Sequence, residues 1–547
     1  MGPLGGESLS CRPVLSPADA GLTWLSARET DAATTYAELC DFYAAHDPRR
    51  LSLQFEGRST TYADLVRVTD AVARALAASG CRRGDRIAYL GKNSDRYFVL
   101  ALGAGKCGVV TAPINWRSSA VEVGAILDDA GANLLFCDPE FLPRVQGRQG
   151  LRVILLEQGT NDRAGFDAWC RSGEGLPLPS RSQATDPFVQ LYTSGTTGRP
   201  KGVVLSQANL LAHRPRGGTW IESWRTWTDT DVSLVAMPVF HVGGSNWGFA
   251  ALANGARAFI EREFDPRKVL DTVERHGITK LFLVPSAIQI VVREFQRRPI
   301  DFSGVRYLLY GASPIPLELM LETMQTLRCQ LVQLYGMTET AGTVVALPPH
   351  AHHGSGAERL RSAGRPLPGV EVAIVDAEGR HVQPRTPGEI LIRSPSNMLG
   401  YWQREDETRA TLGADGWLRT GDAGFLDEEG YLTIQDRLKD MIISGGENVF
   451  PAEVENAILG HPDVAEVAVI GVPDAQWGEA VLACVVARPG ADHDAGSILA
   501  WARERIAGFK VPKAVQFVEA LPRNAAGKVL KRELRHPFWE GRNRAVN

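Results

Sequence analysis

Short apolar runs alternate with amphipathic stretches along the first two thirds of the chain. Between about residues 36 and 185, the amphipathic stretch 62–79 is followed by apolar runs at 86–90, 109–113 and 133–137. A second series extends from about 188 to 334, with apolar runs at 232–237, 280–284 and 307–310. Continuous apolar runs are typical of parallel strands that amphipathic helices bury on both faces. The pattern therefore predicts two doubly wound α/β subdomains.

The pattern changes after residue 340. Short alternating strands, joined by turns rich in Gly, Pro and Asp, are indicated by EVAIVD (371–376), GEILIR (388–393) and GYLTIQD (430–436). They predict a small β-barrel-like subdomain over about 341–437. The remaining residues predict a compact α+β unit with helices at 452–459 and 495–506 and strands at 464–471 and 481–488. The predicted fold is thus α/β, with a loose extension over 1–35, a large domain over 36–438 and a small domain over 439–547.

Composition and charge exclude several classes of protein. The chain has 547 residues, of which 44% are hydrophobic and 22% charged, as is typical of globular and not of disordered proteins. A net charge of -4 gives no electrostatic footprint for nucleic acid. Eight scattered cysteines predict neither a disulfide framework nor a zinc site, and they favour a cytoplasmic location.

The N-terminus and the longest apolar stretch both argue against membrane insertion. MGPLGGESLS lacks the basic and apolar regions of an export signal, and Gly6 stands where a myristoylation signal has Ser or Thr. The stretch 97–114 is interrupted by Lys106 and several glycines, so it predicts a buried helix and strand. Peripheral membrane contact stays open, as does the choice between a monomer and a homodimer.

The segment TSGTTGRPKG, residues 193–202, has the composition of a phosphate-binding loop. Its glycines let backbone N–H groups turn toward an anion, its hydroxyls donate hydrogen bonds, and Lys201 adds positive charge. Apolar runs at 188–192 and 203–205 flank it, so we expect a hairpin-like connection between buried strands. The spacing does not fit the common GxxxxGK nucleotide-binding loop. A glycine-rich surface turn with one solvated lysine is the alternative interpretation.

Two further segments offer carboxylates. YGMTET (335–340) follows the apolar run 331–334 and places Glu339 at the C-terminal end of a strand, where open α/β sheets bind ligands. A carboxylate there suits Mg²⁺. In TGD (420–422), Asp422 in a tight turn can accept both hydroxyls of a ribose. Taken alone, each segment favours a plainer interpretation: an exposed helix-capping residue for Glu339 and an ordinary turn for TGD.

These motifs occur together with GAS (311–313), DRLKDMIISGGENV (436–449) and PRNAAGKVLKREL (522–534). In this combination and order, over about residues 36–534, the chain resembles the adenylate-forming enzymes: acyl- and aryl-CoA synthetases, luciferases and peptide-synthetase adenylation domains. It is most similar to bacterial fatty-acyl-CoA ligases. The resemblance implies an acid–thiol ligase that uses ATP and Mg²⁺ to convert a carboxylate to acyl-AMP and pyrophosphate, and then forms acyl-CoA from coenzyme A.

The resemblance also assigns roles to residues. Lys528 becomes the catalytic lysine that bridges the attacking carboxylate and the α-phosphate, Glu339 a ligand of Mg²⁺, and His241 an orienting or gating residue near the acyl site. A lone histidine among apolar residues is otherwise most often a satisfied core residue. The implied nucleotide-binding residues are Thr193, Ser194, Gly195, Thr196, Thr197, Gly198, Lys201, Gly311, Ala312, Ser313, Tyr335, Gly336, Thr338, Asp422 and Arg437.

The second step is implied to use another face of the small domain. Enzymes of this family rotate that domain about a hinge residue, which corresponds to Lys439, and so replace Lys528 with a surface for CoA. The corresponding residues are Ser444, Gly445, Gly446, Trp477 and Lys513. A further basic contact of some relatives corresponds to Val511, which is uncharged, and Lys106 is expected to contribute from the large domain.

The implied acyl pocket includes Trp247, Val284 and Met337 and has no evident cation for a second carboxylate. Residues 242–244 read VGG where amino-acid-activating relatives carry an aspartate. We therefore expect a hydrophobic monocarboxylic acid, with a medium- or long-chain fatty acid favoured. An aryl acid of the benzoate or coumarate type and a carrier-protein thiol as acceptor are the open alternatives. Trp247 either shortens the pocket or only flanks it.

Overall fold

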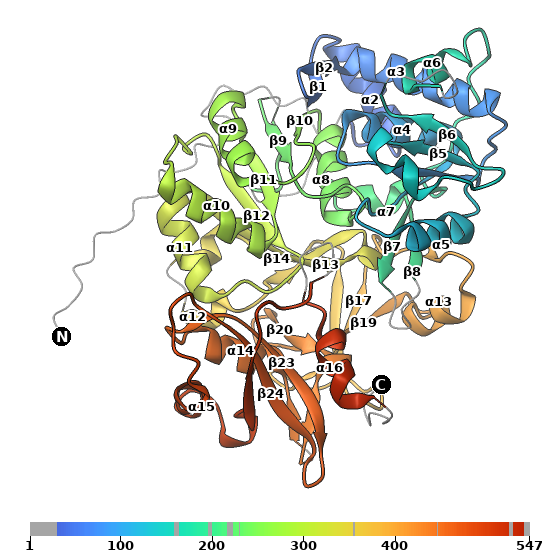
Figure 1. The fold of residues 1–547 in the computed structure, drawn as a ribbon. Helices are drawn as coiled ribbons and strands as arrows, with labels where there is room; N and C mark the ends of the chain where they lie inside the picture. The colour runs from blue at the N-terminus through green and yellow to red at the C-terminus, as the bar shows by residue number, and fades with distance from the viewer. Residues whose placement is uncertain are drawn as a thin grey trace. The chain divides into compact units, whose positions relative to one another are not determined.

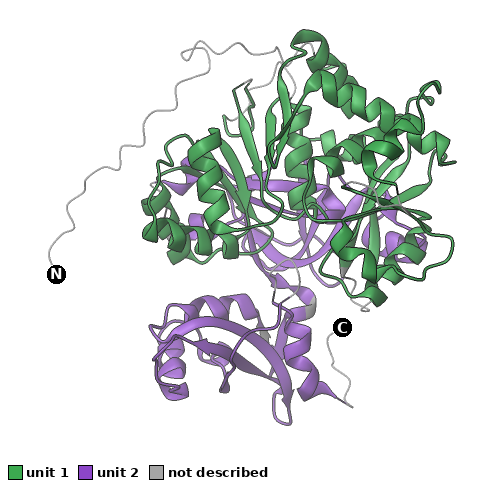
Figure 2. Ribbon diagram, turned by 45° about the horizontal axis from the view of Figure 1, so that its top comes forward, with its two compact units in different colours: residues 1–332 green, residues 333–547 purple. Residues whose placement is uncertain are grey.

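A computed structural model describes residues 30–157, 164–194, 200–215, 223–228, 230–353, 356–445, 447–523 and 529–540. The chain divides into two compact units, Met1–Val332 and Gln333–Asn547 (Figure 2). Most of the predicted extension over 1–35 lies outside the described residues. Figure 1 labels the helices and strands.

The first unit contains two largely parallel sheets, as the hydrophobic pattern predicts. In one sheet the strands follow the order β8, β7, β4, β3, β5 and β6, and β7 and β8 form its antiparallel pair. The predicted apolar runs form β3 (Arg86–Leu90), β4 (Val110–Pro113) and β5 (Leu134–Cys137). The other elements are α2 (Tyr36–His46), α3 (Tyr62–Ala78), α4 (Asp95–Cys107), α5 (Ala120–Ala130), β6 (Arg152–Leu155), α6 (Phe166–Arg171), β7 (Pro187–Ser194), β8 (Pro200–Ser206) and α7 (Gln207–Leu211).

In the second sheet of this unit the strand order is β12, β11, β9, β10, β1 and β2. All of these neighbours are parallel except the hairpin of β1 and β2. Helices α9, α10 and α11 pack side by side on this sheet (Figure 1). The bounds are β1 (Leu51–Phe55), β2 (Arg58–Thr61), β9 (Val232–Val235), α8 (Val242–Ala253), β10 (Arg257–Ile260), α9 (Pro266–His276), β11 (Lys280–Leu283), α10 (Pro285–Arg297), β12 (Tyr307–Gly311) and α11 (Leu317–Leu327).

Aromatic side chains pack where α4 and α8 meet inside the first unit. The ring centroids of Phe98 and Phe249 lie 5.3 Å apart, and the hydroxyls of Tyr97 and Ser245 lie 2.6 Å apart. A Cβ at Gly248 would lie 2.3 Å from the Phe98 ring, so α8 approaches α4 this closely only with a glycine here. The stretch 97–114 is thus a buried helix and strand, as predicted.

The second unit holds antiparallel sheets. Strand β14 (Gly342–Leu347) pairs with both β13 (Gln330–Met337) and β15 (Arg365–Pro366). The alternating strands predicted after residue 340 form a sheet in the order β16 (Glu371–Val375), β17 (Gly388–Arg393), β19 (Trp417–Leu426) and β20 (Leu432–Arg437). Between them lie α12 (Ala357–Leu360), β18 (Gly400–Tyr401) and α13 (Glu405–Thr411).

The C-terminal residues form the α+β unit that the sequence predicts. Its sheet has the order β22 (Glu447–Val449), β21 (Ile442–Ser444), β24 (Gly478–Ala487) and β23 (Val464–Asp474), with β25 (Ala514–Phe517) parallel to β24. Helices α14 (Pro451–Leu459) and α15 (Ala495–Arg503) contribute Val454, Ile458 and Ile498 to its apolar core. The last helix, α16 (Lys531–Trp539), packs against β23.

Partly buried ion pairs fix α16 in place. Lys531 Nζ lies 2.8 Å from a carboxylate oxygen of Glu455 and 3.7 Å from one of Asp436. Arg535 lies 2.9 Å from Asp440. The helix that follows Lys528 in the sequence is therefore anchored to residues on both sides of position 439. Among the described helices, none combines the length and apolarity needed to cross a bilayer.

Candidate active site

The predicted phosphate loop connects two paired strands. β7 and β8 are antiparallel, and Thr193 lies opposite Lys201 in their register. This confirms the hairpin-like connection. Gly195, Thr196, Thr197 and Gly198 lie outside the described residues, as does the side chain of Ser194.

Gly202 has a packing role and not the anion-binding role that the loop motif suggested. It lies inside β8, opposite Tyr192. A Cβ at this position would lie 2.6 Å from the Gln190 amide nitrogen. Gln190 itself donates to the Tyr192 hydroxyl at 2.8 Å and accepts from Arg86 at 3.2 Å. The glycine therefore makes room for a side-chain network that supports the base of the hairpin.

Asp422 is the centre of a hydrogen-bonded network in the second unit. It is only 5% exposed. Its Oδ2 accepts from the Tyr335 hydroxyl at 2.7 Å, and its Oδ1 lies 2.7 Å from Arg437 Nε. Arg437 also donates to the Thr420 carbonyl at 3.3 Å. Three predicted nucleotide-binding residues, far apart in the sequence, are thereby brought together.

The charges in this network are fixed by burial and by proximity. Burial, followed by the neighbouring Asp422, raises the pKa of Tyr335 well above its usual value, so the phenol is a neutral donor. Burial disfavours the charge on Arg437, but Asp422 outweighs it and the pKa of Arg437 is raised. The cation stays fully protonated at neutral pH. A neutral donor and a cation thus hold the carboxylate.

The TGD segment is not the tight turn that was predicted. Residues 420–422 lie inside β19, opposite Ile390 of β17, where the register shifts. Gly421 has φ +67°, and the Thr420 hydroxyl donates to the Ile390 carbonyl at 2.7 Å while accepting from the N–H of Asp422 at 3.0 Å. The segment is a β-bulge, which re-aims a side chain without ending the strand. Alternation alone does not reveal a bulge, which is why the sequence suggested a turn.

Glu339 is a buried residue and not an exposed helix cap. It lies in the short 3-10 turn Thr338–Thr340 and is 7% exposed. Tyr401 donates to its Oε1 at 2.8 Å. The negative charge of Glu339 also contributes to the raised pKa of Arg437. A buried carboxylate beside a cation fits a ligand that binds Mg²⁺ together with substrate phosphates.

Tyr401 is a site residue that sequence reasoning missed. It lies in β18, 62 residues after Glu339. Burial, followed by Glu339, raises the pKa of Tyr401, so its phenol remains a donor. The segment GYWQ around it has no composition that marks a ligand site. Only the fold brings it to the carboxylate.

His241 lies at the N-cap of α8 in the first unit. Its Nε2 is buried and has no hydrogen-bond partner among the residues that the structure describes. Burial, and to a smaller extent the charge of Arg117, lowers the pKa of His241 to about 4. The imidazole is therefore neutral at physiological pH, and its orphaned nitrogen is not that of a satisfied core histidine. This suits an orienting residue that waits for a polar group of a ligand.

The remaining predicted residues of the first unit lie in a helix or near the ends of strands. Trp247 is in α8, Val284 caps α10, and Gly311 ends β12. Ala312 has φ +69°, a left-handed conformation that is uncommon for a residue with a Cβ and is often found at functional sites. The structure thus marks GAS independently of the motif. Met337, in the second unit, ends β13.

Three of the predicted CoA residues of the small domain form one cluster: Gly445, Trp477 and Lys513. Gly445 has φ +62°, and a Cβ there would lie 2.7 Å from the Trp477 ring. Its N–H donates to the Trp477 carbonyl at 2.8 Å, and Lys513 Nζ lies 5.3 Å from the centroid of that ring. Trp477 is 41% exposed. Lys528, Gly446 and the side chain of Lys439 lie outside the described residues.

Lys106 does not fit the expected role of a contact for CoA. It is 8% exposed and lies in α4. Its Nζ is 2.6 Å from Asp70 and donates to the Val66 carbonyl at 3.3 Å. A buried ammonium that is already paired has a structural role. The expectation for Lys106 is therefore wrong.

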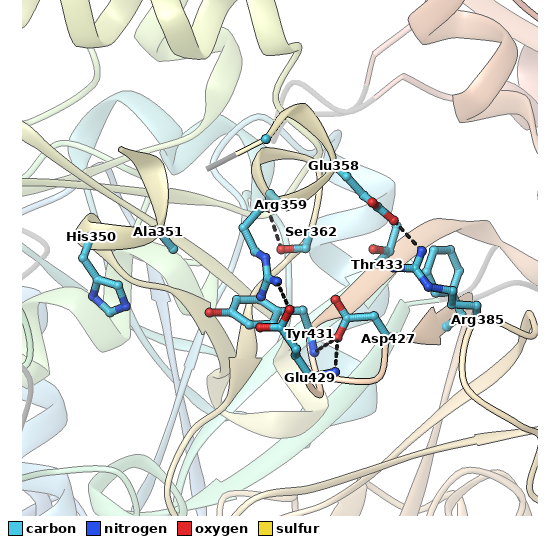
Figure 3. A pocket seen from close by; sticks show the side chains of 12 residues that line it. His350, Ala351, Glu358, Arg359, Ser362, Arg385, Asp427, Glu429, Tyr431 and Thr433 are labelled. Carbon is cyan, nitrogen blue, oxygen red and sulfur yellow. Dashed lines mark hydrogen bonds and ion pairs between the residues drawn. The ribbon is translucent and has the colours of Figure 1, made fainter. Parts of the chain in front are cut away.

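A polar hollow of about 450 Å³ lies elsewhere in the second unit (Figure 3). Arg359 lies 3.4 Å above the centroid of the Tyr431 ring and donates to Glu429 at 2.8 Å. Arg385 pairs with Glu358 at its rim. The lining residues are all different from the predicted site residues, and the cations among them are paired with neighbouring carboxylates. Surface ion pairs therefore line this hollow.

Comparison with known proteins agrees with this geometry. The model of the AMP-binding enzyme family matches residues 40–402, and the model of the AMP-binding enzyme C-terminal domain matches residues 453–528. The fold is that of the adenylate-forming enzymes, and the class is that of the acid–thiol ligases. The chain belongs to the AMP-binding enzyme family.

Individual relatives are similar over nearly the whole chain. The fatty acid–[acyl-carrier-protein] ligase ScoC of Streptomyces coeruleorubidus is 40% identical over 94% of this chain and 98% of its own length. The feruloyl-CoA synthase of an Amycolatopsis species is 38% identical over 90% of this chain and 97% of its own. The structure of O-succinylbenzoate CoA synthetase from Bacillus subtilis, in complex with ATP and magnesium, is 31% identical with a TM-score of 0.79. The match covers 91% of this chain and 98% of the synthetase chain.

Proposed function

We propose that this enzyme activates a hydrophobic carboxylic acid with ATP and Mg²⁺ and then transfers the acyl group to the thiol of CoA. The observation that carries the proposal is the network in which Tyr335 and Arg437 hold Asp422. A carboxylate has about four lone-pair sites, so Asp422 retains the capacity to accept ribose hydroxyls. A plain structural ion pair would need only the cation, whereas here a phenol and a β-bulge also fix the same carboxylate.

In the first step, a carboxylate oxygen of the acid attacks the α-phosphorus of ATP, and the bond to the bridging oxygen breaks to release pyrophosphate. Lys528 neutralises the charge that develops between the two reactants. Glu339, oriented by Tyr401, is the proposed ligand of Mg²⁺, which offsets the charge on the leaving phosphates. The loop over 193–202 binds those phosphates. His241 stays neutral and orients the acid.

In the second step, the CoA thiolate attacks the acyl carbon and AMP leaves. We place the domain boundary at 438/439, with Lys439 as the hinge about which the small domain, 439–547, turns. The support for a CoA surface is the cluster of Trp477, Gly445 and Lys513. The exposed indole of Trp477 suits an adenine ring, and the backbone at Gly445, which has no side chain, suits a pantetheine amide. The ammonium of Lys513 suits a phosphate.

Two observations favour alternative candidates for the acceptor and for the acid. ScoC, at 40% identity, is named as a ligase for an acyl-carrier protein, so a carrier thiol is a second candidate for the acceptor. The aromatic residues around Trp247 favour an aryl acid as an alternative to the medium- or long-chain fatty acid that the sequence suggests. Both candidates keep the same first step.

The test is pyrophosphate release over a panel of fatty, aryl and branched acids, without an acceptor, with CoA and with a pantetheinylated carrier protein. We expect acid-dependent release that CoA accelerates, and acyl-CoA as the product. If only the carrier protein accelerated pyrophosphate release, the acceptor would be a carrier thiol and not CoA. No acid-dependent pyrophosphate from any acid of the panel would contradict the proposed function.

A further inference from the structure

A buried lysine in the first unit fixes a loop close to Trp247. Lys280 of β11 is completely buried. Its Nζ donates to the backbone carbonyl of Trp224 at 3.3 Å and to that of Thr226. The same ammonium lies 4.3 Å from the centroid of the Trp227 ring. One cation therefore holds both the backbone before Trp227 and the indole itself.

Asp231 holds the other side of this loop. Its Oδ2 accepts from the N–H of Thr228 at 2.8 Å and lies 3.9 Å from Lys280 Nζ. Its Oδ1 accepts from the Thr279 hydroxyl at 2.6 Å and pairs with Arg306. The side chains of Asp231 and Lys280 are both 0% exposed. Burying such a pair costs several kcal/mol per ion unless the geometry satisfies it. A surface loop does not need a buried ion pair of this kind, so the pair indicates that the loop is held in one position.

The clamp places one tryptophan against another. The ring centroids of Trp227 and Trp247 lie 5.5 Å apart, and both side chains are half-buried. Trp247 is fixed in turn, because its Nε1 donates to the Leu234 carbonyl at 3.0 Å and its ring lies 6.4 Å from that of Phe282. A Cβ at Gly243 would lie 2.9 Å from Phe282, so the aromatic cluster extends to the start of α8.

We propose that Trp227 is a specificity-determining residue for the acid, and that the Lys280–Asp231 pair is the device that positions it. This inference rests on the proposed function, because Trp247 belongs to an acyl pocket only if the chain activates an acid. Two clamped indoles form a rigid wall with large apolar faces. A compact tail, such as an aryl ring or a short chain, packs against this wall, whereas a long alkyl chain needs the volume that the indoles fill. The substrate class is therefore a compact hydrophobic monocarboxylic acid.

The first experiment compares the wild-type enzyme with Trp227→Ala in acid-dependent pyrophosphate exchange. The acids are butanoate, octanoate, hexadecanoate and 4-hydroxycinnamate. We expect the wild type to prefer a compact acid, and the variant to raise kcat/KM for hexadecanoate relative to that acid by roughly tenfold or more, because even one methylene in a pocket changes this ratio by about 10–200-fold. Trp501→Ala, which removes an indole bonded to the Ala457 carbonyl in the small domain, is the matched control and should keep the wild-type order.

The outcomes separate the two hypotheses. A wild type that prefers hexadecanoate, or an active Trp227→Ala enzyme whose ratio of kcat/KM between hexadecanoate and the compact acid is unchanged, would overturn the inference and leave the proposed function intact. A wild type that adenylates none of these acids would contradict the proposed function itself.

The second experiment tests the positioning role of Lys280. In Lys280→Met, Asp231 keeps Arg306 and Thr279 as partners, while Trp227 loses its cation. We expect KM for the compact acid to rise several-fold, with kcat at saturating acid and KM for ATP within about twofold of the wild type. A fall in kcat with an unchanged KM for the acid would contradict a positioning role.

Discussion

At the scale of single residues, burial sets the protonation of several proposed functional groups in each unit before any ligand binds. Burial keeps Tyr335 and Tyr401 as neutral donors, and each donates to one of the two buried carboxylates. His241 is held neutral, and within the described part of the chain its buried Nε2 has no partner. Phenols restrict the geometry of a carboxylate without neutralising its charge. The residues therefore hold negative charge ready for a ribose and a cation.

Lys528→Ala is expected to slow acyl-AMP formation by roughly two to three orders of magnitude, as the loss of a group that stabilises charge in the transition state does. It should still convert synthetic acyl-AMP and CoA to acyl-CoA, because the second step does not use this ammonium. The rates of acyl-AMP formation and of acyl-CoA formation from synthetic acyl-AMP are measured separately. Lys510→Ala, which removes a lysine paired with Glu453 on the same domain, is the control. Equal loss of both half-reactions would contradict the use of two faces.

Tyr401→Phe is expected to raise the Mg²⁺ concentration for half-maximal adenylation several-fold, because Glu339 loses the donor that orients it. At saturating Mg²⁺, the rate should recover most of the wild-type value. Glu339→Gln, which removes the proposed ligand itself, should not recover. A Tyr401→Phe enzyme with an unchanged Mg²⁺ dependence would show that the hydrogen bond only supports folding.

At the scale of elements, a bulge and a paired hairpin carry the segments that we propose to bind the nucleotide. β19 continues through TGD because Gly421 takes a left-handed conformation there, and the extra residues turn Asp422 toward Tyr335 and Arg437. The strands β7 and β8 hold both ends of the loop over 193–202. Regular strands thus fix the segments, and local irregularities aim their side chains.

Gly421→Ala is expected to raise KM for ATP several-fold, because a Cβ strains the left-handed backbone by about 1–2 kcal/mol and shifts Asp422. Gly430→Ala is a matched control. Gly430 has φ +79°, and at both glycines a Cβ would meet nothing within 4 Å, so strain is the shared effect. The two variants should lose similar thermal stability, and only Gly421→Ala should change KM for ATP. If Gly421→Ala and Gly430→Ala had the same KM for ATP, the bulge would not position Asp422.

At the scale of the whole molecule, one buried and two partly buried histidines link folding to pH. Burial is the main cause that lowers the pKa of His213, His241 and His352, each to about 4 from an ordinary value near 6.5. Between these values the unfolded chain binds protons that the folded chain does not. The stability contributed by the neutral histidines is therefore complete above about pH 6.5 and is lost as the pH falls toward 4.

The thermal midpoint should accordingly fall between pH 7 and pH 5. Each such histidine contributes a slope of up to about 1.4 kcal/mol per pH unit in this window. His352→Gln should show a smaller fall than the wild type, and His46→Gln, at an exposed position, should show the wild-type fall. An identical fall in His352→Gln would contradict the role of this histidine.

The hydrophobic pattern predicted most of the fold. Runs such as 86–90 and 307–310 became strands β3 and β12 almost to the residue, because strands buried on both faces are continuous apolar runs. The failures have physical causes. The TGD bulge breaks no alternation, and the pairing of Lys106 with Asp70 depends on which helices pack together.

The class of the enzyme follows from its motifs, because the chemistry of phosphate, ribose and carboxylate resides in residue types and spacing. Which groups meet depends on the folded chain. Tyr401 lies 62 residues from Glu339, and Lys280 reaches the carbonyl of Trp224 56 residues away. Such contacts depend on how strands and helices pack and on which polar groups remain to be satisfied when water is removed. No local pattern of residues encodes them.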